Sequence, residues 1–572
     1  MMKIIKGIPA SGGIAAGPAY IFKPTEIGVK RETIQNPAAE LSRLESARNV
    51  AREQLKAIKL KTENEASADE AAIFDAHAMF LDDPSLLELV ADTVNAEKVN
   101  VEAAWADGIE NFARQMEMMG DEYLSARAAD IRDVGKRVLR ILSGQSETDL
   151  SGLNAPSVIL AQDLTPSDTA RLNKDFVLGF ATAEGGPTSH TAILAKALGL
   201  PAVVGCGPAL MEIKSGSEML IHGGKGELIA DPDEKTKQLY QKLTGEATRV
   251  AGVELEAAAE HAVTRDGRQV EIVANVGSPS DAVSALKYGA EGIGLLRTEF
   301  LYLERTTAPT EEEQLAAYNA VLDVMEKRPV VVRTLDVGGD KQLDYLDLGK
   351  EANPFLGWRA IRMCLDKPDF FKIQLRALLR ASPNHDLRIM FPMIATLEEV
   401  RRSKALLAEA RKEVLAAGHP VADNIQVGIM VEIPAAAQMA DFFAREVDFF
   451  SIGTNDLTQY TMAAERTSEK MAYLADPCHP AVIRQIKRVI EEGHKQGIWV
   501  GVCGEMAGDP EAAPILLGLG LDEFSMAAPG IPHLKAILRE WSYADAQKLA
   551  EHVLNLENGT AVREYVRGFT HA

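Results

Sequence analysis

Cysteine is scarce in this chain, with four residues among 572, at Cys206, Cys364, Cys478 and Cys503. They lie far apart, and no two form a C-x-x-C pair, so the pattern suggests neither a disulfide framework nor a cysteine zinc site. Unpaired thiols are typical of proteins in a reducing compartment. We therefore expect a cytoplasmic location.

Long apolar runs and a surplus of positive charge are also missing. No stretch approaches the roughly 18 consecutive apolar residues of a membrane-spanning helix, and Gly and Pro interrupt the apolar start of the chain, unlike a signal peptide. The chain has 61 basic and 83 acidic residues, a formal net charge of −22. We expect neither membrane insertion nor nucleic-acid binding, because both phosphate-rich surfaces would be repelled, whereas a basic protein partner fits.

The length and composition indicate a folded protein of several domains. A chain of 572 residues exceeds what one core supports, so two to four domains are expected. Residues 1–22 contain a Gly-rich turn and a short strand, and short apolar runs typical of a β/α domain return from Ser157 onwards. Between them, residues 40–142 have a helical pattern that Pro84 and Gly120 divide into roughly four helices. The helices therefore look like an insertion into one domain built from both flanks.

Eight apolar runs alternate with helical stretches after residue 265, which predicts a C-terminal (β/α)₈ barrel rather than a doubly wound sheet. The expected strands are 270–276, 292–297, 329–335, 387–392, 426–432, 448–453, 499–503 and 523–526. The complete division is a β/α domain formed by 1–22 and 146–230, a helical insert at 23–145, a helical linker at 231–262 and the barrel at 263–572. The chain is thus predicted to be a multidomain α/β protein.

Polar residues gather where the predicted barrel strands end, which is where the active sites of such barrels lie. Glu432 and Asp456 follow neighbouring strands, and two carboxylates together with a substrate phosphate are a common way to hold Mg²⁺. Arg297, Arg333 and Arg466 supply the local positive charge that the acidic chain otherwise lacks. Guanidinium groups bind phosphate and carboxylate oxygens in pairs, so a small molecule bearing both groups fits best.

Two further residues could take part directly in chemistry. Cys503 follows a strand, and although most free cysteines only fill space, a thiol with an ordinary pKa of about 8.5 could protonate an enolate carbon at neutral pH. His190 follows Gly185 and Gly186 in the first turn of a predicted helix. A helix N-terminus disfavours imidazolium and welcomes anions, so His190 should be a neutral nucleophile that can carry a phosphoryl group.

Six segments with these residues resemble enzyme I of the bacterial phosphoenolpyruvate-dependent sugar phosphotransferase system. They are residues 7–17, 188–191, 335–341, 353–359, 453–460 and 503–507. The resemblance covers nearly the whole chain. It implies a phosphoenolpyruvate-protein phosphotransferase that takes the phosphoryl group of phosphoenolpyruvate onto Nε2 of His190, passes it to a histidine of the phosphocarrier protein HPr and releases pyruvate.

The same resemblance implies roles for individual residues. Phosphoenolpyruvate would be bound by Arg297, Arg333, Asn455, Asp456 and Arg466, Mg²⁺ by Glu432 and Asp456, and the enolate would be protonated by Cys503. Thr169, Lys341 and Arg359 are expected in supporting positions, with Thr169 orienting the imidazole of His190. The 1–22 and 146–230 domain would carry the phosphohistidine and swivel, the helical insert would bind HPr, and the barrel would form a homodimer.

Three positions depart from the usual pattern of the resembled family. Pro187 and Lys196 stand where Arg is usual, and Glu465 replaces Asp before Arg466. Eight acidic residues between Glu63 and Glu88 could be a docking surface for a basic carrier or an ordinary solvated helix face. Two other functions remain as alternatives, an enzyme similar to pyruvate phosphate dikinase or phosphoenolpyruvate synthase, and a non-enzymatic scaffold. The first would need an ATP-binding domain, and no P-loop is present.

Overall fold

The structure is a computed structural model of the chain, and it divides into two compact units, Met1–Arg249 and Val250–Ala572. It describes residues 2–569 except 24–26, 66–72, 119–121, 146–149, 151, 152, 154, 166, 167, 169–175, 187, 188, 190, 193, 196–198, 304, 339–342, 344, 347–350, 352 and 466–468.

The first unit contains one mixed sheet whose strand order is β1-β8-β7-β3-β4-β5-β6-β2. Its strands are β1 Lys3–Lys6, β2 Ile8–Ser11, β3 Ile14–Phe22, β4 Ser157–Ala161, β5 Val177–Thr182, β6 Ala202–Val204, β7 Glu218–His222 and β8 Glu227–Ala230. β3 pairs in parallel with β4 and antiparallel with β7. Strands from both sides of the helical segment therefore share one sheet, although more than 130 residues separate β3 from β4 in the chain.

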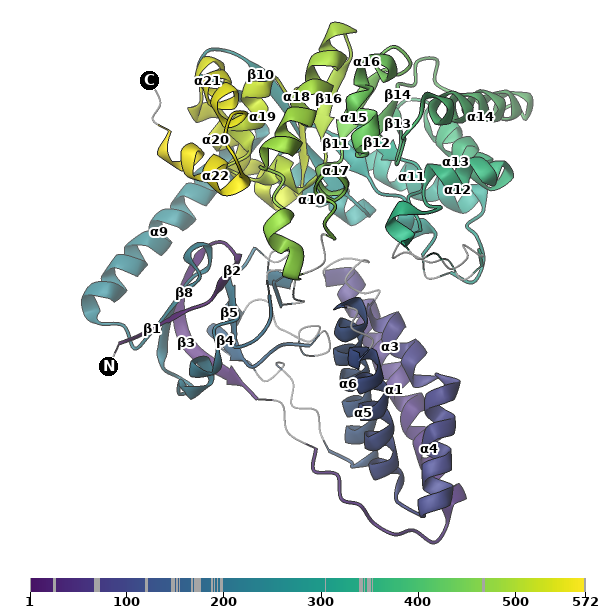
Figure 1. The fold of residues 1–572 in the computed structure, drawn as a ribbon, viewed down its shortest axis with the longest axis vertical. Helices are drawn as coiled ribbons and strands as arrows, with labels where there is room; N and C mark the ends of the chain where they lie inside the picture. Colours follow the sequence, from purple (N-terminus) through teal and green to yellow (C-terminus); the bar gives the residue numbers. More distant parts are fainter. Residues whose placement is uncertain are drawn as a thin grey trace. The chain divides into compact units, whose positions relative to one another are not determined.

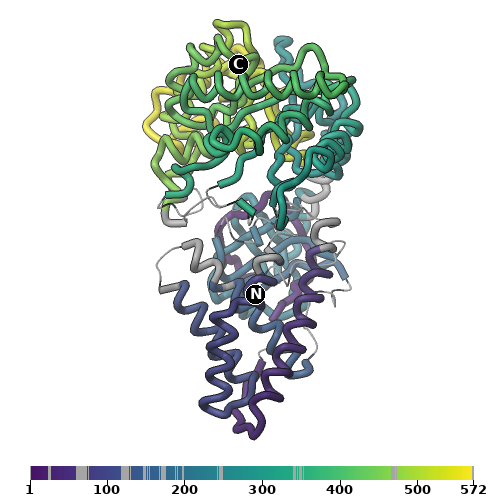
Figure 2. The backbone as a smooth tube through the Cα atoms, turned by 90° about the vertical axis from the view of Figure 1, so that its right-hand side faces the viewer, coloured from purple at the N-terminus to yellow at the C-terminus, as the bar shows by residue number. Residues whose placement is uncertain are grey.

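Helices fill the segment between β3 and β4. They are α1 Pro37–Glu65, α3 Ile73–Leu81, α4 Pro84–Glu97, α5 Val101–Met118 and α6 Glu122–Leu142, and they lie side by side as a bundle (Figure 2). Trp105 is fully buried at the centre, and its indole donates a hydrogen bond to the carbonyl of Gly135 across 3.1 Å. The described part of the segment thus holds five helices, where roughly four were predicted, and the predicted break by Pro84 is confirmed, since Asp83 caps α4 there.

A single helix, α9 Glu234–Glu256, carries the chain from one unit into the other (Figure 1). It ends in a short 3-10 helix, Ala257–Ala259. There the buried ammonium of Lys535 donates hydrogen bonds to the carbonyls of Ala258 and Gly289, each at 2.9 Å, and pairs with Glu291 at 2.9 Å. An α-helix thus occupies most of the segment 231–262 that the sequence predicts to be a helical linker.

The second unit is a closed barrel of eight parallel strands. These are β10 Gln269–Val276, β11 Ile293–Leu296, β12 Pro329–Arg333, β13 Asp386–Phe391, β14 Val427–Val431, β15 Phe449–Ile452, β16 Trp499–Val502 and β17 Glu523–Met526. Each pairs in parallel with the next, and β17 pairs with β10 to close the barrel, while the short β9 Ala262–Val263 adds to β10 antiparallel. The predicted barrel is confirmed, with every predicted strand within two residues of an observed one.

Helices alternate with the barrel strands along the chain and surround the barrel. They are α10 Pro279–Lys287, α11 Glu311–Met325, α12 Ile361–Asp366, α13 Pro368–Ala381, α14 Leu397–Ala416, α15 Pro434–Gln438, α16 Ala440–Phe443, α17 Thr454–Met462, α18 Pro480–Lys495, α19 Ala513–Leu519, α20 Ile531–Glu540, α21 Tyr543–Val553 and α22 Gly559–Gly568. Short 3-10 helices add Glu299–Leu301, Pro354–Leu356, Glu469–Leu474, Glu505–Gly508 and Ala528–Gly530.

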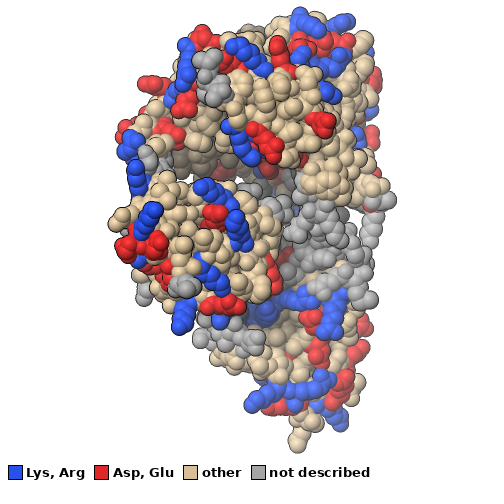
Figure 3. All heavy atoms as spheres, turned by 60° about the vertical axis from the view of Figure 1, so that its left-hand side comes forward, with Lys and Arg blue, Asp and Glu red and all other residues tan. Residues whose placement is uncertain are grey.

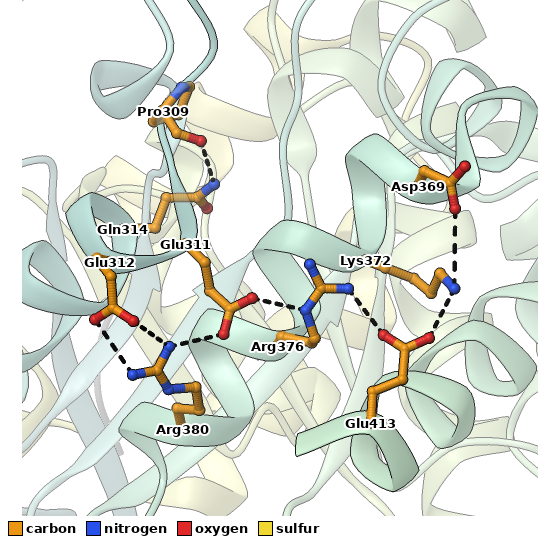
Figure 4. Close-up of polar contacts among 9 residues, drawn as sticks. All are labelled: Pro309, Glu311, Glu312, Gln314, Asp369, Lys372, Arg376, Arg380 and Glu413. Carbon is orange, nitrogen blue, oxygen red and sulfur yellow. Dashed lines mark hydrogen bonds and ion pairs between the residues drawn. The ribbon is translucent and has the colours of Figure 1, made fainter. Parts of the chain in front are cut away.

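Ion pairs connect three of these outer helices (Figure 4). On α13, Arg376 binds Glu311 of α11 at 2.6 Å and Glu413 of α14 at 2.8 Å. Lys372 and Arg380 extend the row to Glu413 and Glu311, each at 2.8 Å. Such pairs at the barrel surface contribute little individually, and the helices that they join already pack on the barrel core.

Two further features concern the surface. None of the described helices is long and apolar enough to cross a membrane. Acidic and basic side chains are intermingled on the face drawn in Figure 3.

Candidate functional site

Most of the predicted site residues lie at the carboxyl ends of barrel strands. Arg297 follows β11, Arg333 is the last residue of β12, Glu432 follows β14 and Cys503 follows β16. Asn455 and Asp456 lie in the first turn of α17, directly after β15. Parallel strands of a closed barrel end on the same side, so residues separated by more than 200 positions in the sequence are brought to one rim.

Four of the predicted site residues, His190, Thr169, Arg466 and Lys341, lie outside the described residues, as do Pro187 and Lys196. Next to His190, Ser189 is described, and its hydroxyl accepts a hydrogen bond from the amide of Ala192 at 3.4 Å. The sequence allows either Thr188 or Ser189 to cap the predicted helix, and this contact is of the kind that an N-cap residue makes. Gly185 adopts a φ of +93°, which favours glycine over other residues.

Arginine and carboxylate side chains form a buried network on the barrel rim. Asp336 accepts two hydrogen bonds from Arg359, at 2.9 and 3.1 Å. It also forms an ion pair with Arg333 at 3.0 Å. Arg333 also pairs with Glu299. Burial opposes the charge of each guanidinium, but the neighbouring carboxylates outweigh it and raise the pKa of both Arg333 and Arg359. Both therefore stay cationic, held in fixed positions by Asp336.

Asp336 and Glu299 are positioning residues to which the sequence alone assigned no role. Both stand near strand ends, so their positions were visible in the pattern, but acidic residues at strand ends are also common as ordinary loop ion pairs. Only the structure shows that Asp336 bridges Arg333 of one strand and Arg359 of the following segment. Arg359 extends the network to Tyr460 of α17, 3.3 Å away.

Glu432 and Asp456 form a pair of buried carboxylates close to this network. Glu432 is 1% exposed, and one of its oxygens accepts a hydrogen bond from the amide of Met393 at 2.6 Å. Burial raises the pKa of Glu432 to about 8, and the charges of Asp456 and Asp336 act in the same direction. Like charges in a buried site are the situation that a bound cation relieves.

This pair fits a divalent cation with a limited set of protein ligands. Among the described residues, no three His, Cys, Asp or Glu side chains are grouped so that they could hold a metal ion by themselves. Mg²⁺ usually keeps several water or substrate oxygens and needs only one or two carboxylates. Glu432 and Asp456 supply hard oxygen ligands of this kind, so the chemistry of the pair is compatible with Mg²⁺.

Cys503 is buried at the end of β16, with 6% of its surface exposed. Its thiol points to the carbonyl of Ile452, 3.7 Å away, and its amide donates to the same oxygen at 3.0 Å. Burial raises the pKa of this thiol to about 12. The expectation of an ordinary thiol pKa was therefore wrong, because the sequence did not reveal how deeply the strand end is buried.

The strand ends around Cys503 are joined by side-chain amides. Asn275 of β10 donates to the carbonyl of Cys503 at 3.0 Å and accepts a hydrogen bond from the hydroxyl of Ser525 at 2.6 Å. Asn455 accepts from the amide of Glu505 at 3.0 Å. These contacts connect the ends of β10, β16 and β17 to α17, so the thiol and the α17 carboxylate are held in a defined arrangement.

The rim thus combines fixed guanidinium groups, two carboxylates and a buried thiol that remains protonated. Guanidinium groups suit the oxygens of a phosphate or carboxylate, and a protonated thiol can act as a general acid. The arrangement is suited to a small anionic substrate that ends its reaction by accepting a proton.

Comparison with known proteins gives three adjoining family matches. Residues 6–127 match the N-terminal domain of PEP-utilising enzymes, residues 153–226 match their mobile domain and residues 254–543 match their PEP-binding domain. The first match covers β2, β3 and most of the helical segment, the second covers β4 to β7 of the mixed sheet, and the third covers the barrel strands.

Curated relatives match over the whole chain. A phosphoenolpyruvate-protein phosphotransferase of Geobacillus stearothermophilus is 51% identical over 99% of this chain and 98% of its own length. The protein of the same name from Priestia megaterium is 48% identical over 100% of both chains. A solution structure of an Enzyme I protein is 40% identical over 43% of this chain and 99% of its own, with a TM-score of 0.38, so the assignment rests on the sequence relatives. The chain belongs to the family of PEP-utilising enzymes, among the phosphoenolpyruvate-protein phosphotransferases.

Proposed function

We propose that this enzyme transfers the phosphoryl group of phosphoenolpyruvate to His190 and then to a histidine of the carrier protein HPr, releasing pyruvate, as the first step of sugar uptake by the phosphotransferase system. The observation that carries the proposal is the joint placement of Arg333, Glu432, Asp456 and Cys503 on one barrel rim, in a chain that matches phosphoenolpyruvate-protein phosphotransferases over 99% of its length.

In this proposal, the barrel binds the substrate. Arg297, Arg333, Asn455 and Arg466 hold the phosphate and carboxylate of phosphoenolpyruvate, with Lys341 and Arg359 in support. Asp336 contributes by keeping the guanidinium groups of Arg333 and Arg359 in place at 2.9–3.1 Å. Because Asp336 and Glu299 fix these guanidinium groups, little reorganisation is needed when the charged substrate enters.

Glu432 and Asp456 would hold Mg²⁺. When bound, the ion would neutralise charge on the phosphoryl oxygens. The mutual repulsion of the two carboxylates, which contributes to the raised pKa of Glu432, is consistent with a site built for a cation. Asp456 also lies 3.9 Å from Arg359, so its position is fixed by the network that orients the substrate.

The chemical step consists of one phosphoryl transfer and one proton transfer. Nε2 of His190, oriented by Thr169, attacks phosphorus, and the bond between phosphorus and the enol oxygen breaks. The resulting enolate takes the proton of the Cys503 thiol on its terminal carbon and leaves as pyruvate. The thiolate then recovers a proton from solvent.

The proposal divides the work among the parts of the chain. Residues 1–22 and 146–230 form the domain that carries His190, residues 23–145 bind HPr, residues 231–262 link the two units and the barrel at 263–572 binds substrate and pairs in a homodimer. Transfer requires His190 to reach the barrel rim and then the carrier, so we infer that the linker permits a swivelling motion. A cytoplasmic location is part of the proposal, and the four buried free thiols are consistent with it.

Labelled phosphoenolpyruvate tests this function. With Mg²⁺, the protein should acquire acid-labile label in amounts equal to the pyruvate released, and added HPr should accept the label and allow continuous turnover. The His190→Ala variant should remain unlabelled, whereas His419→Ala, at an exposed position of the barrel unit, should behave as the wild type. Label that persists in His190→Ala would contradict the proposal. A cycle that needs ATP instead of HPr would favour a dikinase or synthase.

A further inference from the structure

Arg563 of the C-terminal helix α22 contacts three carboxylates at once. Its guanidinium forms a two-pronged pair with Asp476, from Nε at 3.0 Å and Nη2 at 2.8 Å. The remaining nitrogen, Nη1, lies 2.7 Å from Asp509 and 3.1 Å from Glu511. All three nitrogens of this side chain are therefore engaged, which is the geometry in which Arg binds most specifically.

The three carboxylates belong to two loops that leave the barrel on the side of the proposed active site. Asp476 lies between α17 and α18, near the end of the segment that also contains Arg466. Asp509 and Glu511 lie between β16 and α19, in the loop that begins at Cys503. Both loops follow the carboxyl end of a barrel strand, where the active sites of (β/α)₈ barrels are built.

The local backbone is adapted to this contact. A Cβ atom on Gly559, at the start of α22, would come within 2.3 Å of a carboxylate oxygen of Asp476, so glycine allows the helix to approach. Asp476 also accepts a hydrogen bond from the amide of Cys478 at 2.9 Å, and Asp509 accepts one from the amide of Glu511 at 2.9 Å. Asp476 and Asp509 therefore connect Arg563 to the backbone of their loops.

The positive charge of Arg563 offsets the repulsion among the three carboxylates that it contacts. The group contains three carboxylates, and the neighbouring Arg567 pairs only with Glu511 among them. Side chains of this group are about a quarter exposed, so their mutual repulsion is only partly screened by water. Without Arg563, Asp476 would face Asp509 and Glu511 with no cation between them, and the two loops would be pushed apart.

We propose that Arg563 is a positioning residue that clamps the loop between α17 and α18, through Asp476, to the loop after β16, through Asp509 and Glu511, so that the loop that begins at the proton donor Cys503 keeps its position. The proposal rests on the function proposed above for Cys503. It assigns a role in the barrel reaction to the C-terminal helix α22, for which the proposed function names no substrate contact.

Rate measurements on matched variants test this role. Arg563→Gln should lower the single-turnover rate of His190 phosphorylation by phosphoenolpyruvate at least tenfold, with a smaller change in KM. The rate is affected more because the transition state depends most on the relative position of the two loops. Arg563→Lys should restore part of the rate, since an ammonium supplies the charge without the fork. Arg567→Gln is the matched control, one helical turn away, and should stay within twofold of the wild type.

Two further measurements separate this role from general stability and from the proposed function. Transfer of the phosphoryl group from already phosphorylated enzyme to HPr does not use the barrel, so it should be unchanged in Arg563→Gln. Gly559→Ala keeps Arg563 but displaces Asp476, and it should show the same slow phosphorylation even if Arg563→Gln fails to fold. Equal rates in Arg563→Gln and Arg567→Gln, or a wild-type rate in Gly559→Ala, would overturn the clamp. Failure of the wild type itself to be phosphorylated would instead overturn the proposed function.

Discussion

Two buried acids, the thiol of Cys503 and the carboxyl group of Glu523, face low-polarity surroundings in the barrel. Burial raises the pKa of Cys503 to about 12 and that of Glu523 to about 8. Both groups consequently hold a proton at neutral pH. For Cys503 this state serves the proposed chemistry, because only the protonated thiol can act as a general acid.

Replacing Cys503 by alanine should slow pyruvate formation by about 100-fold or more, the usual contribution of a general acid, while leaving the affinity for phosphoenolpyruvate nearly unchanged. Single-turnover kinetics and equilibrium binding measure the two effects. Because the thiol pKa lies near 12, no loss of rate from ionisation of Cys503 is expected up to about pH 10. Cys364→Ala, at a fully buried thiol without a proposed role, is the control and should keep its rate. A wild-type rate in Cys503→Ala would remove the thiol from the mechanism.

Glu523 should make the barrel less stable as the pH rises. The ordinary pKa of a Glu carboxyl is 4.5, and below this pH Glu523 is protonated in both the folded and the unfolded state. Between pH 4.5 and about 8, only the folded state keeps the proton. The folded state therefore loses stability relative to the unfolded state across this window, by on the order of a few kcal/mol. At pH 8, Glu523→Gln should unfold at a higher temperature than the wild type. At pH 5 this increase in unfolding temperature should be smaller.

Thermal unfolding at several pH values checks this expectation, with Glu557→Gln at an exposed position of the same unit as the control. Parallel pH profiles of Glu523→Gln and the wild type would show that Glu523 is not protonated in the folded barrel.

At the scale of elements, α17 and the loop after β16 approach each other closely. A Cβ atom on Gly504 would lie 1.9 Å from the hydroxyl oxygen of Thr454 and 2.8 Å from its amide nitrogen. The φ of Gly504 is −81°, so the need for glycine here comes from crowding and not from backbone strain. The close approach keeps Cys503 next to the residues at the start of α17.

Gly504→Ala should therefore displace the first turn of α17, which carries Asn455 and Asp456. We expect at least a tenfold loss of kcat/KM for phosphoenolpyruvate, because displacements near 1 Å in a binding site can cost about that much or more. Steady-state kinetics measures the loss. Gly568→Ala, where an added Cβ meets nothing within 4 Å, should leave the kinetics unchanged. If Gly504→Ala kept full activity, the close packing of α17 would have no catalytic importance.

The same kind of constraint operates between the outer helices. The row of ion pairs from Glu312 to Glu413 joins α11, α13 and α14 (Figure 4). Arg563, in contrast, joins α22 to two loops. The first network lies along helices whose positions the core already fixes, so its loss should cost little. The second connects two loops next to the proposed active site, so its loss should affect function more.

The whole molecule consists of two units with separate hydrophobic cores. The barrel unit contains one large cluster and a smaller one that includes Cys503, and the helical bundle and the mixed sheet have clusters of their own. The phosphoryl acceptor proposed here belongs to one unit and the substrate site to the other. Binding and transfer should therefore be separable.

Residues 250–572, produced alone, should fold and bind phosphoenolpyruvate in the presence of Mg²⁺ with an affinity close to that of the full chain, but should release no pyruvate. Calorimetry and a pyruvate assay measure the two properties. Full-length His190→Ala should behave in the same way and serves as the control. Pyruvate release by the isolated unit would place the phosphoryl acceptor within the barrel and contradict the role of His190.

Much of this organisation was predictable from the order of residues. The alternation of apolar runs and helices located all eight barrel strands, and polar residues at the strand ends pointed to Arg333, Glu432, Asp456 and Cys503. Such patterns are local in the chain, because strand and helix periods are two and 3.6 residues. The helical insert was recognised for the same reason, although its described part contains five helices where roughly four were expected.

The sequence by itself determined the types of element and the candidate residues, since both depend on neighbours in the chain. The tertiary structure alone decided how Asp336 bridges Arg333 and Arg359, how burial raises the pKa of Cys503, and how Arg563 reaches Asp476. These properties depend on distance and on exclusion of water between groups far apart in the sequence. No local pattern contains that information, because closing the barrel is what brings the groups together.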